Sequence, residues 1–209
     1  MQKQKPSKNK LILGLTGSFG SGKTTVARIL KSFGAEIFDA DKLAHKCISP
    51  GSRAYKIIIQ TFGKGILGKN KLINRKKLAK IVFNNKNLLR KLNNIIHPQV
   101  VRIIEQRIKN SKSKVIVLDV PLLVESGLTK IIDKLIVVKI NRREQLKRLQ
   151  NKTYFDKRDI LKRIKSQMPL SRKVRLAHFV IDNSGTIKET EKQAKNIWKK
   201  MNLSLAAKK

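Results

Sequence analysis

The stretch GSFGSGKT, residues 17–24, decides the fold of this 209-residue chain. It fits the pattern GxxxxGK followed by Ser or Thr, in which backbone N–H groups wrap around nucleotide phosphates. The apolar run Leu11–Thr16 before it is typical of a buried strand, and Thr24–Ser32 after it has apolar residues at helical spacing. A strand, a glycine loop and a helix in this order predict a binding site for ATP or GTP. The alternative, a chance glycine turn before a helix, is disfavoured by the Gly, Lys and Thr at these spacings.

Each part of this loop has an expected task. The start of the helix directs N–H groups and a partial positive charge toward the phosphates. Lys23 can reach the β- and γ-phosphates, and the hydroxyl of Thr24 can bind magnesium. The predicted nucleotide-binding residues of the loop are Gly17, Ser18, Phe19, Gly20, Ser21, Gly22, Lys23 and Thr24.

The net charge is far larger than one nucleotide site needs. The chain has 49 Lys and Arg against 13 Asp and Glu, a formal charge of +36. A nucleic-acid partner would use such a field through counterion release, and anionic substrates would be drawn in faster. The simpler interpretation is a compositional bias spread over solvated helix faces, because the lysines recur throughout and few aromatic residues lie between them. Charge alone therefore predicts only nonspecific nucleic-acid binding.

Composition also bears on the compartment. Cys47 is the only cysteine, so an intramolecular disulfide is impossible and a reducing cytoplasm fits. The basic residues 1–10 lead directly into the strand and the loop, which is unlike an export signal. Val115–Val124 is the most apolar later segment, but it contains Asp119 and Pro121 and falls short of the about 20 residues that cross a bilayer. We expect a soluble cytoplasmic protein with no membrane contact and no obligate protein partner.

Alternating strands and helices follow the loop. Further strands are predicted at 36–39, 115–119, 134–140 and 179–182, and helices at 53–62, 74–83, 86–96, 99–109, 142–150, 157–167 and from 186 to about Trp198. Pro98 is expected to open a new helix, and Asn141 with Glu144 and Thr186 with Glu189 are expected capping boxes. This order predicts an α/β fold with three layers, a five-stranded parallel sheet, a helical insertion and a lid.

The same pattern divides the chain. The expected parts are a basic tail at 1–10, a nucleotide-binding core at 11–51 and 111–200 with a lid at about 151–170, a helical acceptor-binding insertion at 52–110, and a tail at 201–209. Ligands of such sheets bind where the strands end. That edge gathers Asp39, Asp41, Asp119, Asn141 and Asn183.

Two kinds of side chain can serve phosphoryl transfer there. Asp41 can accept the proton of an attacking hydroxyl, or it can cap the helix through Lys46, and Asp39 has the same ambiguity between a magnesium shell and a turn. Arg148 belongs to a basic group with Arg142, Arg143, Lys147 and Lys152. Closure of the lid can place one of these cations against the β- and γ-phosphates, or the side chains can simply be solvated. His97-Pro98 reads as a helix boundary whose imidazole can also touch an anionic acceptor. No Cys/His cluster has the spacing of a zinc site.

Taken together, the motifs resemble those of the dephospho-CoA kinase family. The matching segments are Leu15–Thr25, Phe38–Ala44, Pro50-Gly51, Phe62-Gly63, Asn74-Arg75, His97-Pro98, Pro121–Ser126, Gln145–Leu149 and Val180–Gly185. They span residues 11 to 198. The phosphate loop is common to many kinases, whereas Asp-Ala-Asp and Pro-Leu-Leu-Val-Glu in this order are more specific.

The resemblance implies a reaction and a set of roles. The γ-phosphoryl group of ATP, with Mg²⁺, would pass to the ribose 3′-hydroxyl of dephospho-CoA, giving CoA and ADP. Asp41 would be the base, Arg148 and Lys23 would contact phosphate, and the helical segment 52–109 would bind the CoA moiety. Further residues implied at the site are Thr25 and Asn183 for the nucleotide, Arg75, His97, Leu122, Leu123 and Glu125 for the acceptor, and Lys152 in the lid.

This chain departs from the family pattern at a few positions. Ser18 and Phe19 stand where glycine and a small aliphatic residue are usual, which makes the loop bulkier. Lys152 replaces a common lid arginine, and His178 replaces an aspartate. Two other functions stay open from the residues: a kinase of the same fold acting on a nucleoside or nucleotide, and an NTPase that couples nucleotide state to RNA binding.

Overall fold

The structure, a computed structural model, describes residues 10–83, 85–152 and 156–206, with the side chains of 83, 152 and 202–206 outside that description. It divides into two compact units. We call Met1–Phe38 with Ser111–Lys209 the sheet unit, and Asp39–Asn110 the helical unit. Within the described residues, no helix is long and apolar enough to span a membrane.

A five-stranded sheet organises the sheet unit. Its order is β2 (Glu36–Asp39), β3 (Val115–Asp119), β1 (Leu11–Gly17), β4 (Lys134–Lys139) and β5 (Phe179–Asp182). The pairs β1–β3, β1–β4 and β4–β5 are parallel, with Leu11 opposite Val115 and Leu13 opposite Lys134. All of β1 is buried, which explains its unbroken apolar run. The predicted α/β fold with a five-stranded parallel sheet is confirmed.

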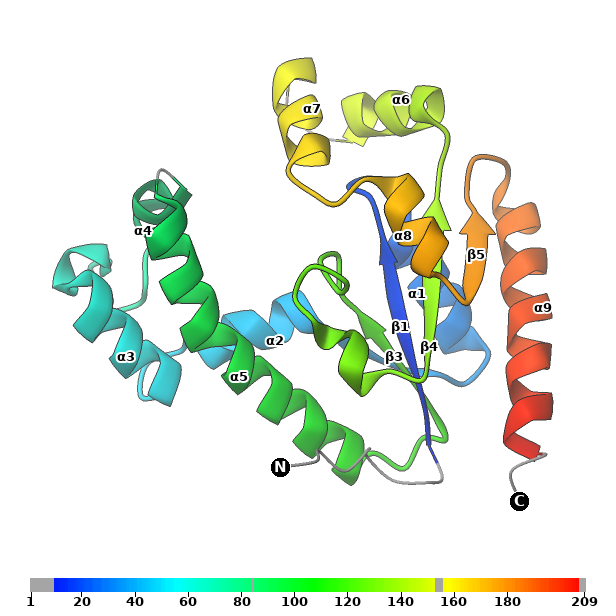
Figure 1. Ribbon diagram of the computed structural model, residues 1–209, viewed down its shortest axis with the longest axis horizontal. Helices are drawn as coiled ribbons and strands as arrows, with labels where there is room; N and C mark the ends of the chain where they lie inside the picture. The colour runs from blue at the N-terminus through cyan, green and yellow to red at the C-terminus, as the bar shows by residue number, and fades with distance from the viewer. Residues whose placement is uncertain (1–9, 84, 153–155, 207–209) are drawn as a thin grey trace. The chain divides into compact units, whose positions relative to one another are not determined.

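Helices cover both faces of this sheet. On one face, α1 (Lys23–Ser32) and α9 (Ile187–Ala206) share a core with the strands, and the rings of Phe33 and Trp198 lie 6.0 Å apart. Figure 1 shows α9 running beside β5. On the other face, α8 (Leu170–Leu176) packs on β4. Gly14 of β1 also faces that side, where a Cβ would come within 2.7 Å of Leu123.

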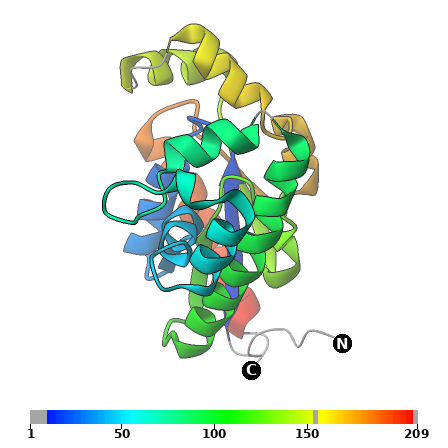
Figure 2. The same cartoon turned by 90° about the vertical axis from the view of Figure 1, so that its left-hand side faces the viewer.

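The helical unit consists of short helices packed on one long helix. Its elements are α2 (Ala40–Cys47), α3 (Arg53–Phe62), η1 (Lys64–Ile66), α4 (Arg75–Phe83) and α5 (Lys86–Asn110). The helices α2, α3 and α4 each contact α5, and Figures 1 and 2 show these coils grouped around it. Because α2 packs on α5, the division between the units falls after Phe38, whereas the sequence suggested a boundary at Gly51.

The prediction that Pro98 opens a new helix is wrong. α5 runs through Pro98 without interruption. Proline removes one helical hydrogen bond and costs about 3 kcal/mol in a helix interior. However, Leu92, Val100, Ile104 and Ile108 form one buried stripe that continues past it. Packing of that stripe outweighs the local penalty.

Smaller differences concern helix ends. α6 (Arg142–Lys152) and α7 (Lys157–Lys165) are present, α8 was not predicted, and α9 extends beyond Trp198 to Ala206. Thr186 and Glu189 form the expected capping box, with backbone N–H groups donating in both directions. The Asn141 box is only half formed, because Asn141 accepts from Glu144 N–H while the Glu144 carboxylate pairs with Arg148.

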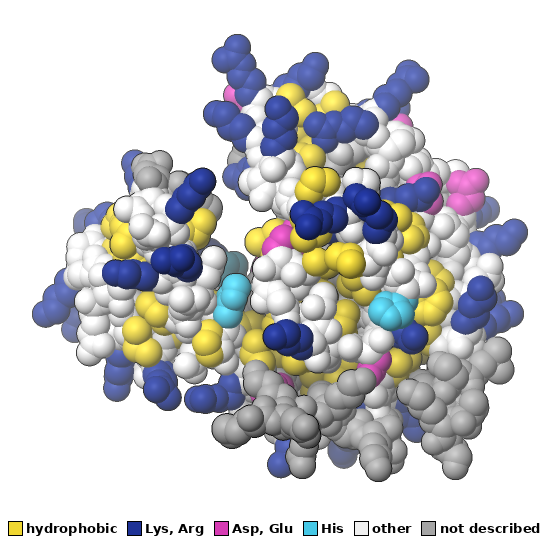
Figure 3. Space-filling model, viewed as in Figure 1, with side chains coloured by type: hydrophobic (Ala, Val, Ile, Leu, Met, Phe, Trp, Pro, Cys, Tyr) yellow, Lys and Arg dark blue, Asp and Glu magenta, His cyan; other side chains and the backbone are white. Residues whose placement is uncertain are grey.

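Basic side chains are widely distributed. Figure 3 shows Lys and Arg over both units in this view, with no single basic patch standing apart. On this face the basic side chains are spread over both units, and nonspecific nucleic-acid binding stays a prediction from the sequence.

Candidate active site

The phosphate loop lies between β1 and α1. Gly20 and Gly22 have φ values of 76° and 88°, in the left-handed region that glycine adopts without strain. Gly22 is also the cap of α1, and its carbonyl accepts from the N–H groups of Thr25 and Val26. Because glycine has no side chain to cap the helix, the first N–H groups of α1 are suited to an anion.

Asn183, at the end of β5, supports the second half of the loop. Its Nδ2 donates to the Ser21 carbonyl at 2.8 Å, and its Oδ1 accepts from Thr190 Oγ1 at 2.9 Å. A Cβ on Gly22 would lie 1.9 Å from Asn183 Nδ2, so only glycine fits there. The resemblance implied a place for Asn183 near the nucleotide, and the structure gives its side chain a contact with the phosphate loop itself.

Two glutamines hold the first half of the loop. Gln145 Nε2, on α6, donates to the Phe19 carbonyl at 2.6 Å and to Ser18 Oγ at 3.0 Å. Gln167 Oε1 accepts from Phe19 N–H at 2.8 Å. The guanidinium carbon of Arg163, on α7, lies 5.8 Å from the centre of the Phe19 ring. The bulky departures Ser18 and Phe19 are therefore contact points for α6, for α7 and for Gln167 just after α7.

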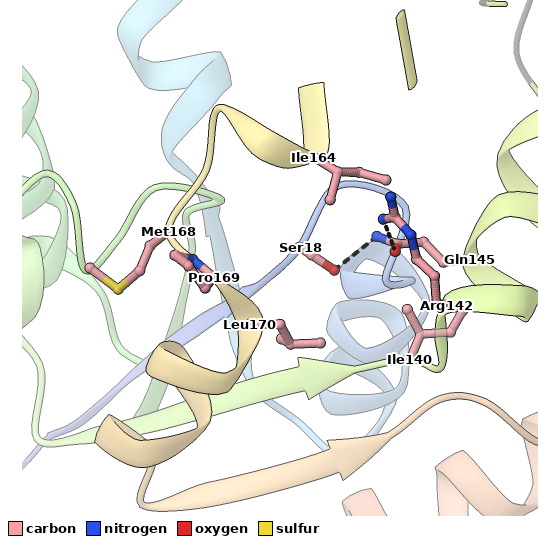
Figure 4. Close-up of a pocket in the computed structure, with 8 residues that line it drawn as sticks. All are labelled: Ser18, Ile140, Arg142, Gln145, Ile164, Met168, Pro169 and Leu170. Atoms are coloured by element: carbon pink, nitrogen blue, oxygen red, sulfur yellow. Dashed lines mark hydrogen bonds between the residues drawn. The ribbon is translucent and has the colours of Figure 1, made fainter. Parts of the chain in front are cut away.

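A pocket of about 200 Å³ opens beside this half of the loop. Figure 4 shows its lining side chains, with Arg142 and Ser18 both bonded to Gln145. The lining residues are Ser18, Ile140, Arg142, Gln145, Ile164, Met168, Pro169 and Leu170. Most are apolar, and Arg142 brings positive charge to the rim. Sequence reasoning singled out Arg142 only as one of several basic residues, and it missed Gln145 and Gln167.

Arg148, on α6, contacts the turn after β5 with its guanidinium group. Its Nη1 donates to the Asn183 carbonyl at 2.9 Å, its Nη2 donates to the Gly185 carbonyl at 3.2 Å, and its Nε is 3.4 Å from Glu144. The next residue, Leu149, is buried behind the loop, where a Cβ on Gly20 would approach it to 2.6 Å. In this arrangement α6 supports both the phosphate loop and the β5 turn. Lys152, the lid residue implied by the resemblance, has its side chain outside the described residues.

The connection after β3 carries three of the acceptor residues implied by the resemblance. Leu123 is fully buried, whereas Leu122 is 46% exposed. Glu125 is 2.9 Å from Lys173 Nζ and accepts from the Met168 N–H. Lys173 is fully buried, and nothing in the sequence pattern marked it.

In the helical unit, the capping role belongs to Asp39 rather than to Asp41. Asp39 Oδ1 accepts from Lys42 N–H at 3.0 Å, and Asp41 lies exposed in the first turn of α2. Arg75, at the start of α4, contacts the ring of His45. His97 lies on α5, where partial loss of hydration lowers its pKa below the ordinary value for histidine.

His178, the other departure from the family pattern, has a structural contact. Its Nδ1 accepts from Leu135 N–H at 3.1 Å, and its own N–H donates to the Leu135 carbonyl at 2.9 Å. It therefore secures the start of β4 next to β5.

Known proteins resemble this chain over most of its length. A family model described as dephospho-CoA kinase matches residues 11–189. Curated dephospho-CoA kinases of Carboxydothermus hydrogenoformans and Aquifex aeolicus are 47% and 44% identical, covering 90% of this chain and 93% and 96% of theirs.

Solved structures agree in fold. A dephospho-CoA kinase from Campylobacter jejuni is 30% identical with a TM-score of 0.68, and protein TT1252 from Thermus thermophilus is 28% identical with a TM-score of 0.82. Both comparisons cover 91% of this chain and 96% of the other. A shikimate kinase from Bacteroides thetaiotaomicron, 9% identical with a TM-score of 0.52, shares the fold alone. The chain belongs to the dephospho-CoA kinase family.

Proposed function

We propose that this protein transfers the γ-phosphoryl group of ATP to the 3′-hydroxyl of the ribose in dephospho-CoA, giving CoA and ADP. One observation carries the proposal: the glycine loop between β1 and α1, with its left-handed Gly20 and Gly22, lies inside the match to the family model. This reaction is the last step of coenzyme A synthesis.

The donor side rests on the sheet unit. The N–H groups at the start of α1 receive the phosphate oxygens, and Lys23, the first residue of α1, neutralises charge on the β- and γ-phosphates. Asn183 and the two glutamines keep the loop backbone in place before ATP arrives, so little ordering is left for binding to cost. Arg148 keeps the turn at Asn183–Gly185 beside the nucleotide.

Magnesium fits this donor site. Thr24 is exposed in the first turn of α1, next to the glycine cradle, and a hydroxyl oxygen is the kind of ligand that Mg²⁺ accepts alongside phosphate oxygens. When bound, the ion supplies charge neutralisation on the phosphates. The Thr24 hydroxyl would hold the ion, whereas Asp39 Oδ1 already accepts from Lys42 N–H, which makes Asp39 the weaker choice of ligand.

The residues proposed to serve the acceptor are Asp41, Arg75 and His97 of the helical unit and Leu122, Leu123 and Glu125 of the sheet unit. Asp41 accepts the proton of the 3′-hydroxyl as that oxygen attacks the γ-phosphorus. Arg75 and His97 contact the acceptor, and Leu122 offers an exposed apolar surface to it. Burial lowers the pKa of His97, which favours the neutral ring, a hydrogen-bonding group, over the cation.

The deciding experiment measures ADP release with Mg²⁺ and ATP against three acceptors: dephospho-CoA, a nucleoside panel and RNA. We expect turnover with dephospho-CoA alone, with the product identified as CoA by mass. A Lys23→Met variant is the negative control for contaminating kinases. Turnover with a nucleoside but not with dephospho-CoA would instead identify a nucleoside kinase of the same fold.

The RNA arm also tests the charge of the chain. We propose that RNA binds weakly, that 0.5 M salt abolishes the complex, and that ADP release does not change when RNA is added. An RNA-dependent rise in ADP release would identify an NTPase coupled to nucleic acid. The cytoplasm as the place of action remains a prediction from the sequence.

A further inference from the structure

Lys173 is a fully buried lysine that the proposed chemistry does not use. Buried lysines are rare unless they are paired, because removing the ammonium group from water is costly. Here Nζ lies 2.9 Å from Glu125 Oε1 and donates to the Pro121 carbonyl at 2.9 Å. Lys173 is fully buried whereas the Glu125 side chain is 22% exposed, and the desolvation of Lys173 cancels much of the attraction, so the pair is weak evidence for stability. Its position therefore needs another explanation.

The pair connects with the phosphate loop along two routes. The Pro121 carbonyl also accepts from Thr16 Oγ1 at 2.9 Å, and Thr16 immediately precedes the loop. The same Glu125 oxygen accepts from Met168 N–H at 3.0 Å. The residue before Met168 is Gln167, whose side-chain oxygen Oε1 accepts from Phe19 N–H.

Phe19 is the point at which this network meets the loop. Gln167 binds its N–H and Gln145 binds its carbonyl, so both polar groups of its backbone are fixed by side chains from distant elements. The loop residues between Gly17 and Gly20 belong to no helix or strand. Their conformation therefore depends on where the side chains of Gln145 and Gln167 are placed.

We propose that Lys173 and Glu125 are positioning residues for the phosphate loop. The pair fixes the chain at Met168, which places Gln167 on Phe19 N–H and keeps the first half of the loop shaped for ATP. This inference rests on the proposed nucleotide site. It can be tested by measuring ATP affinity alone, with no dephospho-CoA present.

The first test removes the pair without leaving a lone buried charge. In the Lys173→Met/Glu125→Leu double variant we expect ATP-Mg²⁺ to bind about five- to tenfold more weakly by calorimetry, the size expected for one or two lost hydrogen bonds. Arg172→Met, an exposed neighbour on α8, is the matched control and should bind ATP like the unmodified protein. A double variant that is folded and binds ATP normally overturns the proposal.

The second test asks whether the pair acts through Gln167. Gln167→Ala should weaken ATP binding by a similar factor, and combining it with the double variant should weaken binding little further, because both changes release Phe19 N–H. Losses that multiply would show independent effects and overturn the route through Met168. A merely structural role of the pair would lower the urea midpoint without this coupling.

A conservative variant keeps the test decisive if the double variant does not fold. Lys173→Arg retains the charge beside Glu125 but changes the donor geometry toward Pro121. We expect a smaller loss of ATP affinity, again absent in the Gln167→Ala background. If the unmodified protein binds ATP normally but does not turn over dephospho-CoA, the proposed acceptor is wrong and the positioning role is untouched. If Arg172→Met weakens ATP binding as the pair variants do, the positioning role is wrong.

Discussion

The phosphate loop and the acceptor-side residues are fixed by different kinds of contact. In the sheet unit, loop backbone groups bond to Gln167 and Asn183, which lie about 150 residues further along the chain. In the helical unit, Asp39 bonds to Lys42 in the next turn, and Arg75 contacts His45 within the same unit. The phosphate loop is thus shaped by contacts that are distant in the sequence, whereas Asp39 and Arg75 take their positions from contacts within the helical unit.

The largest expected effect separates chemistry from capping at Asp39 and Asp41. We expect Asp41→Asn to lower kcat by about 10²- to 10⁴-fold with ATP affinity unchanged, because it removes only the proton acceptor. Asp39→Asn should keep most activity, since asparagine caps helices about as well as aspartate. Steady-state kinetics on both folded variants measures this. A fully active Asp41→Asn protein would remove Asp41 from the chemistry.

The next effect compares one glycine from each unit. Gly22→Ala should abolish measurable ATP binding, because the new Cβ would displace Asn183 Nδ2 from 1.9 Å away as well as strain a φ of 88°. Gly51→Ala has a similar φ of 85° with no atom within 4 Å of the new Cβ, so it should cost only about 1–2 kcal/mol of stability.

Calorimetry with ATP and chemical denaturation distinguish the two glycine variants. Equal losses of ATP affinity in both would mean that backbone strain alone, rather than the contact with Asn183, is responsible.

Arg148 gives a more moderate effect that tests its place in the sheet unit. Its contacts with the Asn183 and Gly185 carbonyls predict that Arg148→Met raises KM for ATP about tenfold while changing kcat little. A side chain that moves onto the transferred phosphoryl group would instead lower kcat. Measuring both constants decides between support of the nucleotide turn and contact with phosphate in the transition state.

The smallest effect concerns His97 in the helical unit. Desolvation lowers its pKa in the folded protein below the ordinary value of 6.5, so the unfolded chain binds the proton first as pH falls. Stability should therefore decrease from about pH 7 downward until the folded pKa is passed. His97→Asn should flatten this part of the curve in urea titrations, and an unchanged slope would mean that other groups cause it.

Local patterns predicted much of this molecule. The loop at residues 17–24, its strand and its helix are defined by neighbours in the sequence, and the strands 36–39, 115–119 and 179–182 have the predicted ends. Each of these signals rests on residues close together in the chain, such as the glycines and the β-branched runs. The expectation that ligands bind at the carboxyl ends of the strands required only that the sheet be parallel.

What the sequence could not supply depends on distant partners. Lys173 looks like any other lysine of a basic helix until Glu125 and Pro121 are seen beside it. Gln167 was predicted as the last residue of a helix over 157–167, but α7 ends at Lys165, and only the contact with Phe19 reveals the role of Gln167. Pro98 gave a wrong prediction of a helix boundary for the opposite reason. Its local preference is outweighed by packing of the buried stripe of α5.

The placement of β1 at the centre of the sheet has a consequence for synthesis on the ribosome. β1 emerges first, but its two neighbours, β3 and β4, begin only at Val115 and Lys134, after the whole helical unit. The contacts of the helical unit lie within residues 39–110, so this unit can form while both backbone edges of β1 are still unpaired. We expect a nascent chain halted near residue 110 to expose the N–H and C=O groups of β1, where a strand of another chain could pair.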